Sequence, residues 1–370
     1  MNLNDFPEPY IPTKLPNKNV QHALMNDSVF LSTIIQRGRK LSEFIGYLQN
    51  LPNPEILITS LTLQEAVLSS RIEGTVATVE DVVNDQPSSD IIKDDIIEIE
   101  NYQNAIQYGY EMLSNTDRGI SKGLIKELHK LLLENNVRGA TKTPGEFKTE
   151  QNYILNNIIG NFTPLPPLLT DDYIDNLVDY IKSSSEFSEL VQAATMHAQF
   201  EMIHPFKDGN GRVGRLLIPL LLFYKKVIPY PIFYISRFFA MNDDQYKALL
   251  ANISKAVSED EKNDAWKQWI LFFFDGIATE SEKHIKISKK IIDLRKEMIS
   301  QVKLTGMIAL IDCLFHELRI EPKEAIPKLQ LPHTSSYKEL RDLAEKGYIT
   351  RKGSSRKTIY IFSKLVDIIQ

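Results

Sequence analysis

The stretch from His204 to Arg215 contains residue types that could bind and transfer phosphate groups. Its sequence is His-Pro-Phe-Lys-Asp-Gly-Asn-Gly-Arg-Val-Gly-Arg. The segment Gly209, Asn210, Gly211 lets the backbone turn sharply and approach a ligand without a Cβ atom in the way. A helical pattern follows, and the unpaired peptide N–H groups at a helix start form an anion site. Arg212 and Arg215 are three residues apart and project from nearly the same helix face, which suits a polyphosphate.

A carboxylate and an imidazole accompany this turn. Asp208 would repel phosphate unless a cation lies between them, which indicates Mg²⁺ held by one carboxylate and phosphate oxygens. A neutral His204 could accept a proton from an attacking hydroxyl group. Taken singly, each feature is more typical of a helix end, a turn or a solvated helix face. Their combination within twelve residues predicts phosphoryl or nucleotidyl transfer, and the missing Gly-Lys-Ser/Thr excludes a Walker A loop.

The elements that must position these residues are expected to be mainly helical. Apolar residues recur at helical spacing in many segments. The expected helices span 41–51, 60–72, 78–83, 94–113, 122–134, 171–184, 188–203, 211–224, 242–258, 264–285 and 282–304. Ser121, Ser188 and Asn242 are expected N-caps. Residues 138–159 contain Gly and Pro among alternating apolar positions and predict a hairpin, whereas residues 1–20, with four prolines, predict an extended arm on the surface.

The last seventy residues form a pattern of their own. Helices are expected at 306–318, 322–329 and 335–347, followed by strands at 348–351 and 358–362 around a basic turn. This order is typical of a winged helix-turn-helix. Its basic residues are Lys338, Arg341, Lys346, Arg351, Lys352, Arg356 and Lys357. Through residues 335–357 the module could bind DNA or contact protein, and the sequence leaves both open.

Composition limits the function classes. The 370 residues carry a net charge of −5, so the whole molecule is not expected to bind polyanions. Cys313 is the single cysteine, so no internal disulfide can form, and its apolar surroundings predict a buried thiol. The longest apolar run, 216–224, is too short to span a membrane. The first residues lack the features of a signal peptide, so a cytoplasmic protein without a membrane partner is expected.

The motif resembles the signature of the Fic family at every defined position from His204 to Arg215. The resemblance extends to 197–203, 145–148, 151–154, 234–237 and 242–246, and covers roughly residues 35–285. It implies a Fic-fold helical bundle with a small β-hairpin flap, followed here by the winged helix-turn-helix. The implied divisions are an N-terminal arm and helical region (1–110), a Fic catalytic core (111–285) and a linker helix with the C-terminal unit (286–370).

The resemblance also implies roles for single residues. His204 would be the catalytic base, and Asp208 would bind Mg²⁺. The backbone at Gly209 and Gly211, together with Asn210 and Arg212, would hold the α- and β-phosphates of ATP, and Arg215 would face the γ-phosphate. Further residues expected to line the nucleotide or target cleft are Asn152, Tyr153, Ile154, Leu155 and Asn242. Lys148 stands where an arginine is common in the flap.

A second motif resembles the inhibitory helix of the same family. Ser69 to Gly74 has the sequence Ser-Ser-Arg-Ile-Glu-Gly. By this resemblance Glu73 would pair with Arg215 in the ATP site and take the place that the γ-phosphate needs. Ser69 would tie the helix to the core.

The implied activity is a protein adenylyltransferase, a nucleotidyltransferase that moves AMP from ATP to Ser, Thr or Tyr hydroxyls of proteins, including itself, with Mg²⁺ as cofactor. Two enzymatic alternatives stay open: transfer of phosphate or another phosphate-containing group, and removal of AMP with Glu73 positioning a water. A DNA-binding regulator that acts through the C-terminal unit is the alternative without catalysis. The sequence also leaves open whether the chain forms a homodimer.

Overall fold

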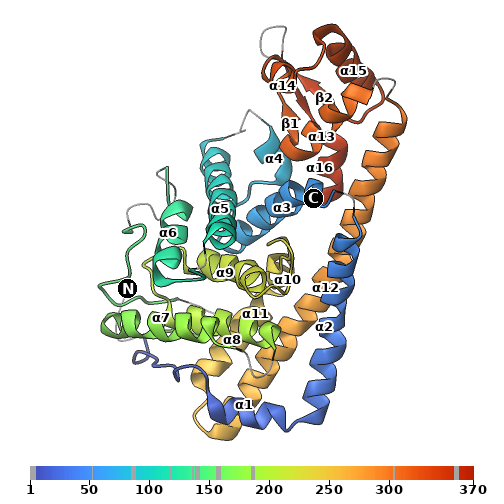
Figure 1. Cartoon of the computed structure of the whole chain (residues 1–370). Helices are drawn as coiled ribbons and strands as arrows, with labels where there is room; N and C mark the ends of the chain where they lie inside the picture. The colour runs from blue at the N-terminus through green and yellow to red at the C-terminus, as the bar shows by residue number, and fades with distance from the viewer. Residues whose placement is uncertain are drawn as a thin grey trace.

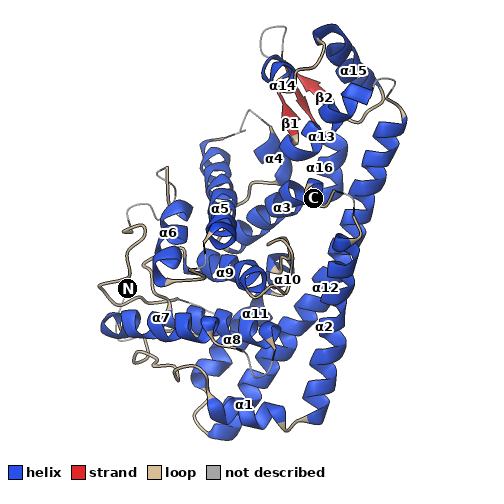
Figure 2. Ribbon diagram, viewed as in Figure 1, coloured by secondary structure: helices blue, strands red, loops and turns tan. Residues whose placement is uncertain are grey.

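The computed structural model describes residues 6–51, 53–84, 89–116, 118–135, 137, 142–155, 160–184, 188–302, 305–353 and 358–370. These residues form a mainly helical molecule with one small sheet near the C-terminus (Figures 1 and 2). This confirms the predicted fold class. The helices before the sheet are α1 (Lys18–Met25), α2 (Ser28–Gln49), α3 (Ile56–Ile72), α4 (Val79–Val83), α5 (Asp90–Asn115), α6 (Lys122–Leu132), α7 (Pro167–Lys182), α8 (Glu189–Ile203), α9 (Asn210–Tyr224), α10 (Ser236–Met241), α11 (Asp243–Lys255) and α12 (Glu259–Ser300).

Two of the three expected N-caps are confirmed. The side chain of Ser121 accepts a hydrogen bond from the Leu124 amide at 3.2 Å, and that of Ser188 accepts one from the Val191 amide at 3.3 Å. Asn242 does stand before α11, but its side chain donates to the Phe238 carbonyl instead of capping the helix. Its amide therefore closes the end of α10 and leaves the first turn of α11 uncapped by a side chain.

The two helices expected at 264–285 and 282–304 are one continuous helix, α12, of 42 residues. The change to charged residues suggested a break, but apolar positions such as Ile287, Ile291, Leu294 and Met298 continue on one buried face. α2 lies along this helix over much of its length (Figure 1). α2 begins at Ser28, well before the expected start at 41.

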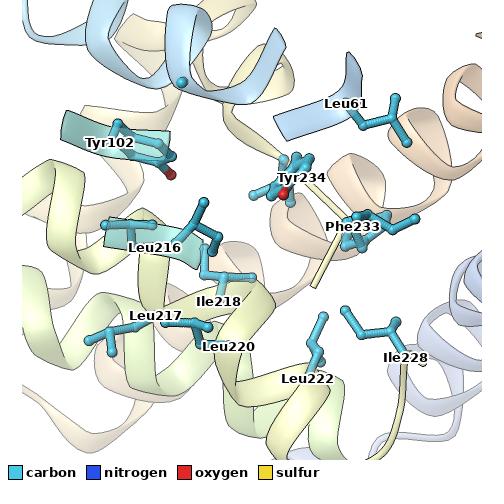
Figure 3. Packing of buried hydrophobic residues seen from close by; sticks show 14 of the residues in the cluster. Leu61, Tyr102, Leu216, Leu217, Ile218, Leu220, Leu222, Ile228, Phe233 and Tyr234 are labelled. Carbon is cyan, nitrogen blue, oxygen red and sulfur yellow. The ribbon is translucent and has the colours of Figure 1, made fainter. Parts of the chain in front are cut away.

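The core of the molecule surrounds α9. This helix packs against α8, α5, α6 and α3, and most of its side chains are buried. Figure 3 shows Leu216 of α9 below Tyr102 of α5, and Leu61 of α3 on the side of Phe233 and Tyr234. The His204–Arg215 stretch thus leads from one central helix, α8, into another.

The N-terminal arm is more firmly held than a surface arm would be. Leu15 is buried, and its backbone exchanges two hydrogen bonds with the Asn176 side chain of α7, at 2.9 and 2.8 Å. Gln199 of α8 donates to the Thr13 carbonyl at 3.1 Å. The arm also ends earlier than expected, because α1 begins at Lys18.

The hairpin expected at 138–159 is wrong in its bounds. Residues 142–155 contain no strand, and a single antiparallel bridge joins Ile154 to Phe162. The second arm of the flap therefore lies beyond residue 159. The segments 138–141 and 156–159 lie outside the described residues.

The C-terminal module, residues 305–370, combines helices with an antiparallel sheet of order β1-β3-β2. Its elements are a short 3₁₀ helix (Thr305–Met307), α13 (Ile308–Glu317), β1 (Arg319–Ile320), α14 (Pro322–Lys328), α15 (His333–Glu345), β2 (Thr350–Lys352), β3 (Ile359–Ile361) and α16 (Ser363–Ile369). β1 and α16 were not expected, and Cys313 is half-buried rather than buried. The winged helix-turn-helix assignment stays a prediction, and Arg356 and Lys357 lie outside the described residues.

None of the helices in the described part of the chain is long and apolar enough to cross a membrane.

Candidate functional site

The turn between α8 and α9 is held in one shape by its own residues. His204 ends α8 with a left-handed backbone, φ 50°, and Gly209 precedes α9 with φ 73°. The Asn210 side chain then closes the loop, because its Oδ1 accepts from the Phe206 amide and its Nδ2 donates to the Phe206 carbonyl, both at 2.8 Å. Both polar groups of this amide therefore shape the backbone of the loop, and the phosphate-binding role expected for Asn210 stays a prediction.

His129 of α6 supports the turn by ring stacking and by a hydrogen bond. The rings of His129 and Phe206 stack at 3.7 Å. His129 Nδ1 accepts from the Gly145 amide at 2.8 Å, which leaves Nε2 to donate to the Asp208 carbonyl at 3.0 Å. Burial lowers the pKa of His129 to about 4, so this ring is neutral at physiological pH. The supporting role of His129 could not be predicted from the sequence, because a histidine in an amphipathic helix carries no distinguishing signal.

His204 is neutral for a similar reason. It is half-buried at the edge of a cavity, and its buried Nδ1 has no hydrogen-bond partner among the described residues. Burial and the nearby charge of Lys148 lower its pKa to about 4. A neutral imidazole beside a cavity is the form that a proton acceptor requires.

Two residues of the flap fasten it to this turn. The buried Lys148 donates from Nζ to the Ile203 carbonyl at 3.0 Å, and burial lowers its pKa to about 7. Asn152 donates to the Phe206 carbonyl at 2.6 Å. Both side chains thus satisfy carbonyl groups near the end of α8, and Asn152 does not line the cavity as expected. Tyr153 also points elsewhere, against Phe6 of the arm at 4.9 Å.

Arg215 and Glu73 form an ion pair across the cavity floor. Arg215 Nη2 lies 2.7 Å from Glu73 Oε1 and 3.0 Å from the Ser69 carbonyl, and Nε donates to Ser69 Oγ at 2.8 Å. Burial opposes ionisation of Glu73, but Arg215 outweighs it and holds the pKa of Glu73 below its usual value. The expected contacts of Ser69 and Glu73 with Arg215 are therefore present.

The Glu73 carboxylate also covers the start of α9. A Cβ atom placed on Gly211 would collide with Glu73 Oε1 and would lie 2.8 Å from Arg215 Nη1. A side chain at this position would therefore push the Glu73 carboxylate and the Arg215 guanidinium group aside. Glu73 stands where an anion would meet the first turn of the helix.

Arg212 differs from the expectation. Its Nη1 lies 2.8 Å from Glu98 Oε2 of α5, with both side chains buried. Arg212 does not line the cavity, so the two arginines predicted to face one ligand meet different carboxylates. Asn242 and Asp208 are likewise absent from the cavity wall.

The cavity itself has a volume of about 1120 Å³, ample for a nucleotide. The expected residues that line it are Glu73, Ile154, Leu155, His204, Gly211 and Arg215. Residues of α11 and residues 6–11 of the arm form further walls of the cavity. These residues were not among those expected at the site. The place of the arm in the cavity wall could not be predicted from local patterns, because the arm precedes His204 by almost two hundred residues.

A buried polar group adjoins the ion pair. Glu201 lines the cavity, and burial raises its pKa to about 7 against the pull of Arg215. His197 Nε2 lies 2.9 Å from the Tyr246 hydroxyl, and burial lowers the pKa of His197 to about 3. His197, Glu201 and His204 are spaced i, i+4 and i+7, which was the available signal that they share a helix face.

Asp208 is the expected metal ligand. Its Oδ1 accepts from the Gly209 amide at 2.7 Å. The described residues contain no group of three or more His, Cys, Asp or Glu side chains that could hold a metal ion by themselves. One carboxylate beside an anion site fits Mg²⁺, which takes its remaining ligands from phosphates and waters.

Comparison with known proteins identifies two successive domains. Residues 20–111 match the Fic/DOC family N-terminal model, and residues 119–222 match the Fic/DOC family model. The chain is 32% identical over 113 residues to "Protein adenylyltransferase fic-1" of Caenorhabditis briggsae, covering 30% of this chain and 21% of that protein. It is 25% identical over 170 residues to "Probable protein adenylyltransferase aq_aa38" of Aquifex aeolicus, covering 45% of this chain and 50% of that protein. The chain thus spans half or less of these relatives.

Solved structures share the fold. A Fic family protein from Desulfovibrio desulfuricans G20 superposes with a TM-score of 0.57 at 21% identity, covering 89% of this chain and 95% of that one. Fic-1 from Caenorhabditis elegans superposes with a TM-score of 0.56 at 17% identity, covering 75% and 79%. Together the two matched family models span more than half of the chain, and the second includes the whole stretch from His204 to Arg215. The chain is therefore a Fic domain protein.

Proposed function

We propose that this protein transfers AMP from ATP to a Ser, Thr or Tyr hydroxyl of a protein. The observation that carries the proposal is that neutral His204, Arg215 and the start of α9 border one cavity large enough for a nucleotide. Relatives named protein adenylyltransferase support the same activity. Self-modification is part of the proposal.

The geometry suggests a mechanism. A protein segment would lie along the flap at Ile154 and Leu155 and present its hydroxyl to His204, which accepts the proton. The hydroxyl oxygen forms a bond to the α-phosphorus, the bond from that phosphorus to the bridging oxygen breaks, and pyrophosphate leaves. Arg215 and the amides at the start of α9 would stabilise the phosphate charge. Mg²⁺, held by Asp208, would neutralise charge on the phosphates.

Glu73 would restrain this reaction. Its carboxylate already occupies the space beside Arg215 and over Gly211. A γ-phosphate would need the same guanidinium group, so ATP must displace Glu73 or bind with its phosphates shifted. Release of Glu73 would therefore speed transfer.

The test is the intact mass of the protein after incubation with ATP and Mg²⁺. Glu73→Gly should increase the modified fraction several-fold over wild type, with the mass gain of an AMP group. Glu73→Gly combined with His204→Ala should show no modification while keeping the circular dichroism spectrum of the parent. A mass gain of phosphate would favour the phosphotransferase alternative. Absence of any gain in Glu73→Gly, with or without a protein extract as target, would overturn the proposal.

The de-AMPylase alternative has a separate test. If Glu73 positions a water for removal of AMP, the modified protein should lose AMP faster in wild type than in Glu73→Gln. Equal loss in both would exclude that role for Glu73.

A further inference from the structure

The N-terminal arm belongs to the cavity wall. Residues 6–11 line the same cavity as His204 and Arg215. Two of these residues, Pro7 and Pro9, have fixed φ angles and favour extended backbone, which makes the wall stiff. Gln199 and Asn176 hold the following residues of the arm on α8 and α7, as described above. The catalytic core therefore fixes where the arm lies.

The arm also pairs with the flap. The Tyr10 amide donates to the Thr163 carbonyl at 2.9 Å, and Thr163 Oγ1 donates to the Pro7 carbonyl at 2.7 Å. Phe162, next to Thr163, pairs with Ile154. The arm thus follows the flap as a third extended segment and leaves the outer edge of the segment around Ile154 for a target.

Tyr10 spans the cavity from the flap to α11. Its ring lies 6.2 Å from the Phe162 ring, and its hydroxyl lies 3.5 Å from the Ile253 carbonyl of α11. Burial raises the pKa of Tyr10, so the hydroxyl stays protonated. Leu250 and Ala251 of α11 line the cavity with it. The wall formed by the arm and α11 thus contains aromatic and aliphatic side chains, next to the polar Ser254 and Lys255.

A nucleoside triphosphate has two chemically different ends, and so has the cavity. The anionic phosphates suit Arg215 and the helix start at Gly211. The flat, apolar faces of a base suit the part bounded by Tyr10 and Leu250. We propose that Tyr10, carried by the N-terminal arm, contacts the base of the bound nucleotide and contributes to the choice of base. This inference rests on the proposed function, since it takes ATP as the ligand.

The experiment measures binding, so that it does not depend on transfer. Glu73→Gly combined with His204→Ala serves as the parent, because it frees Arg215 and prevents turnover. Dissociation constants for ATP, GTP and inorganic triphosphate are measured by calorimetry with Mg²⁺. Adding Tyr10→Ala should weaken ATP about tenfold, the effect of losing one base–aromatic contact. It should also reduce the preference between ATP and GTP and leave triphosphate within about twofold. Tyr10→Phe, which keeps the ring, should bind ATP like the parent.

Tyr337→Ala, which removes a tyrosine ring from α15, is the matched control and should change none of these constants. Unchanged ATP affinity in Tyr10→Ala would overturn the role of Tyr10. Equal weakening of ATP and triphosphate would overturn it as well, because the arm would then act on the phosphate end or on the whole cavity. A parent that binds triphosphate but not ATP would overturn both this inference and the proposed use of ATP. Normal ATP binding by the parent, together with no transfer by Glu73→Gly alone, would count against the proposed function only.

A different observation concerns the middle of α3, around Gln64. This helix is apolar around most of its circumference, which is typical of a helix buried on all sides. It packs on α5, α9 and α10 of the core and, on another side, on α13 and α16 of the C-terminal module. Figure 1 shows α3 between the core and that module. Gln64 of α3 donates to the Ile369 carbonyl at the end of α16 at 2.5 Å.

A second bond joins the module to the segment that follows α3. Lys352 of β2 donates to Asn84 Oδ1, after α4, at 2.6 Å, and α16 packs on α4 as well as α3. Because Gln64 and Glu73 are carried by one rigid helix, a shift of the module moves both. We infer that the C-terminal module clamps α3 and thereby sets how firmly Glu73 occupies Arg215, an inference that also rests on the proposed function.

The test compares Gln64→Ala with Gln301→Ala. Gln301 donates to the Tyr348 hydroxyl at 2.6 Å, so its loss breaks one bond at the module that does not touch α3. Gln64→Ala should raise AMP transfer about fivefold in the wild-type background and leave the rate unchanged in Glu73→Gly. Hydrogen exchange in residues 60–73 should speed up in Gln64→Ala and not in Gln301→Ala. Unchanged exchange in Gln64→Ala would overturn the clamp even if no transfer activity exists. Unchanged transfer alongside an activating Glu73→Gly would overturn its link to the brake.

Discussion

Two arginines one turn apart on α9 meet two glutamates, and the two ion pairs differ in what surrounds them. Arg212 and Glu98 are 2.8 Å apart with side chains 3% and 1% exposed. Arg215 and Glu73 are 2.7 Å apart, with 1% and 32% exposed. The first pair is sealed between α5 and α9, whereas the second opens onto the cavity. The Arg212–Glu98 ion pair therefore serves the packing of two helices, whereas in the Arg215–Glu73 pair the glutamate is open to exchange for a ligand from the cavity.

In the exchangeable pair, Arg215 has further hydrogen-bond partners besides Glu73. Arg215 keeps two hydrogen bonds to Ser69 when Glu73 leaves, one to the hydroxyl and one to the carbonyl. In the proposed reaction, a phosphate would replace the carboxylate while Ser69 keeps its hydrogen bonds to the guanidinium group. Burying an unpaired charge costs several kcal/mol, so the hydrogen bonds to Ser69 lower the free-energy cost of releasing Glu73.

The largest expected effect concerns the sealed pair. Glu98→Ala leaves Arg212 charged and buried without its carboxylate, and should lower the free energy of unfolding by about 3–5 kcal/mol. Glu73→Ala should cost about 1 kcal/mol or less, because Glu73 is partly exposed and Arg215 keeps Ser69. Urea denaturation at pH 7 measures both. Equal losses in the two variants would contradict the distinction between a sealed and an exchangeable pair.

The next effect concerns the second carboxylate near Arg215. The pKa of Glu201 is raised to about 7 by burial, so the folded state binds a proton that the unfolded state releases near pH 4.5. Its contribution to stability is therefore fully present below about pH 4.5 and is lost as pH rises through 7. Glu201→Gln should gain about 2 kcal/mol over wild type at pH 8 and nothing at pH 4.5. A pH-independent difference would show that Glu201 does not titrate in this range. Glu73, with a lowered pKa, has the opposite sign, and its contribution is lost only as pH falls below about 4.5.

Sequence patterns predicted those parts of this arrangement that depend on local spacing. Helical periodicity located α8 and α9, and the resemblance paired Glu73 with Arg215. The partner of Arg212 was not predictable, because Glu98 is 114 residues away in sequence and has no motif of its own. Long-range pairing of this kind is decided by packing, which a single sequence does not reveal.

Amide side chains show a second limit. Asn152 and Asn210 are expected to contact the nucleotide or the target, and both also bond to the backbone of Phe206, which the sequence did not indicate. An asparagine that closes a loop and one that binds a ligand have the same sequence signal, since both lie in turns. The continuous α12 was missed for a related reason. The two expected segments, 264–285 and 282–304, differ in charge, whereas the apolar positions that decide burial continue through both.

The smallest effect tests the support of Arg215, with a matched neighbour as control. Ser69 Oγ accepts from Arg215 Nε at 2.8 Å, whereas Ser70 Oγ is buried and has no hydrogen-bond partner among the described residues. Ser69→Ala should lower the free energy of unfolding by about 1.5 kcal/mol, the low end for a hydrogen bond to a charged group. Ser70→Ala should be neutral or slightly stabilising, because it removes an unsatisfied hydroxyl group.

Transfer activity then separates the two serines further. Without the Ser69 hydroxyl, Arg215 is less firmly oriented toward both Glu73 and a phosphate, so the ratio of the Glu73→Gly rate to the wild-type rate should shrink in the Ser69→Ala background. The same ratio should be unchanged in the Ser70→Ala background. If both serine variants changed the ratio equally, the effect would come from loosening of α3 as a whole, and the specific support of Arg215 by Ser69 would have to be abandoned.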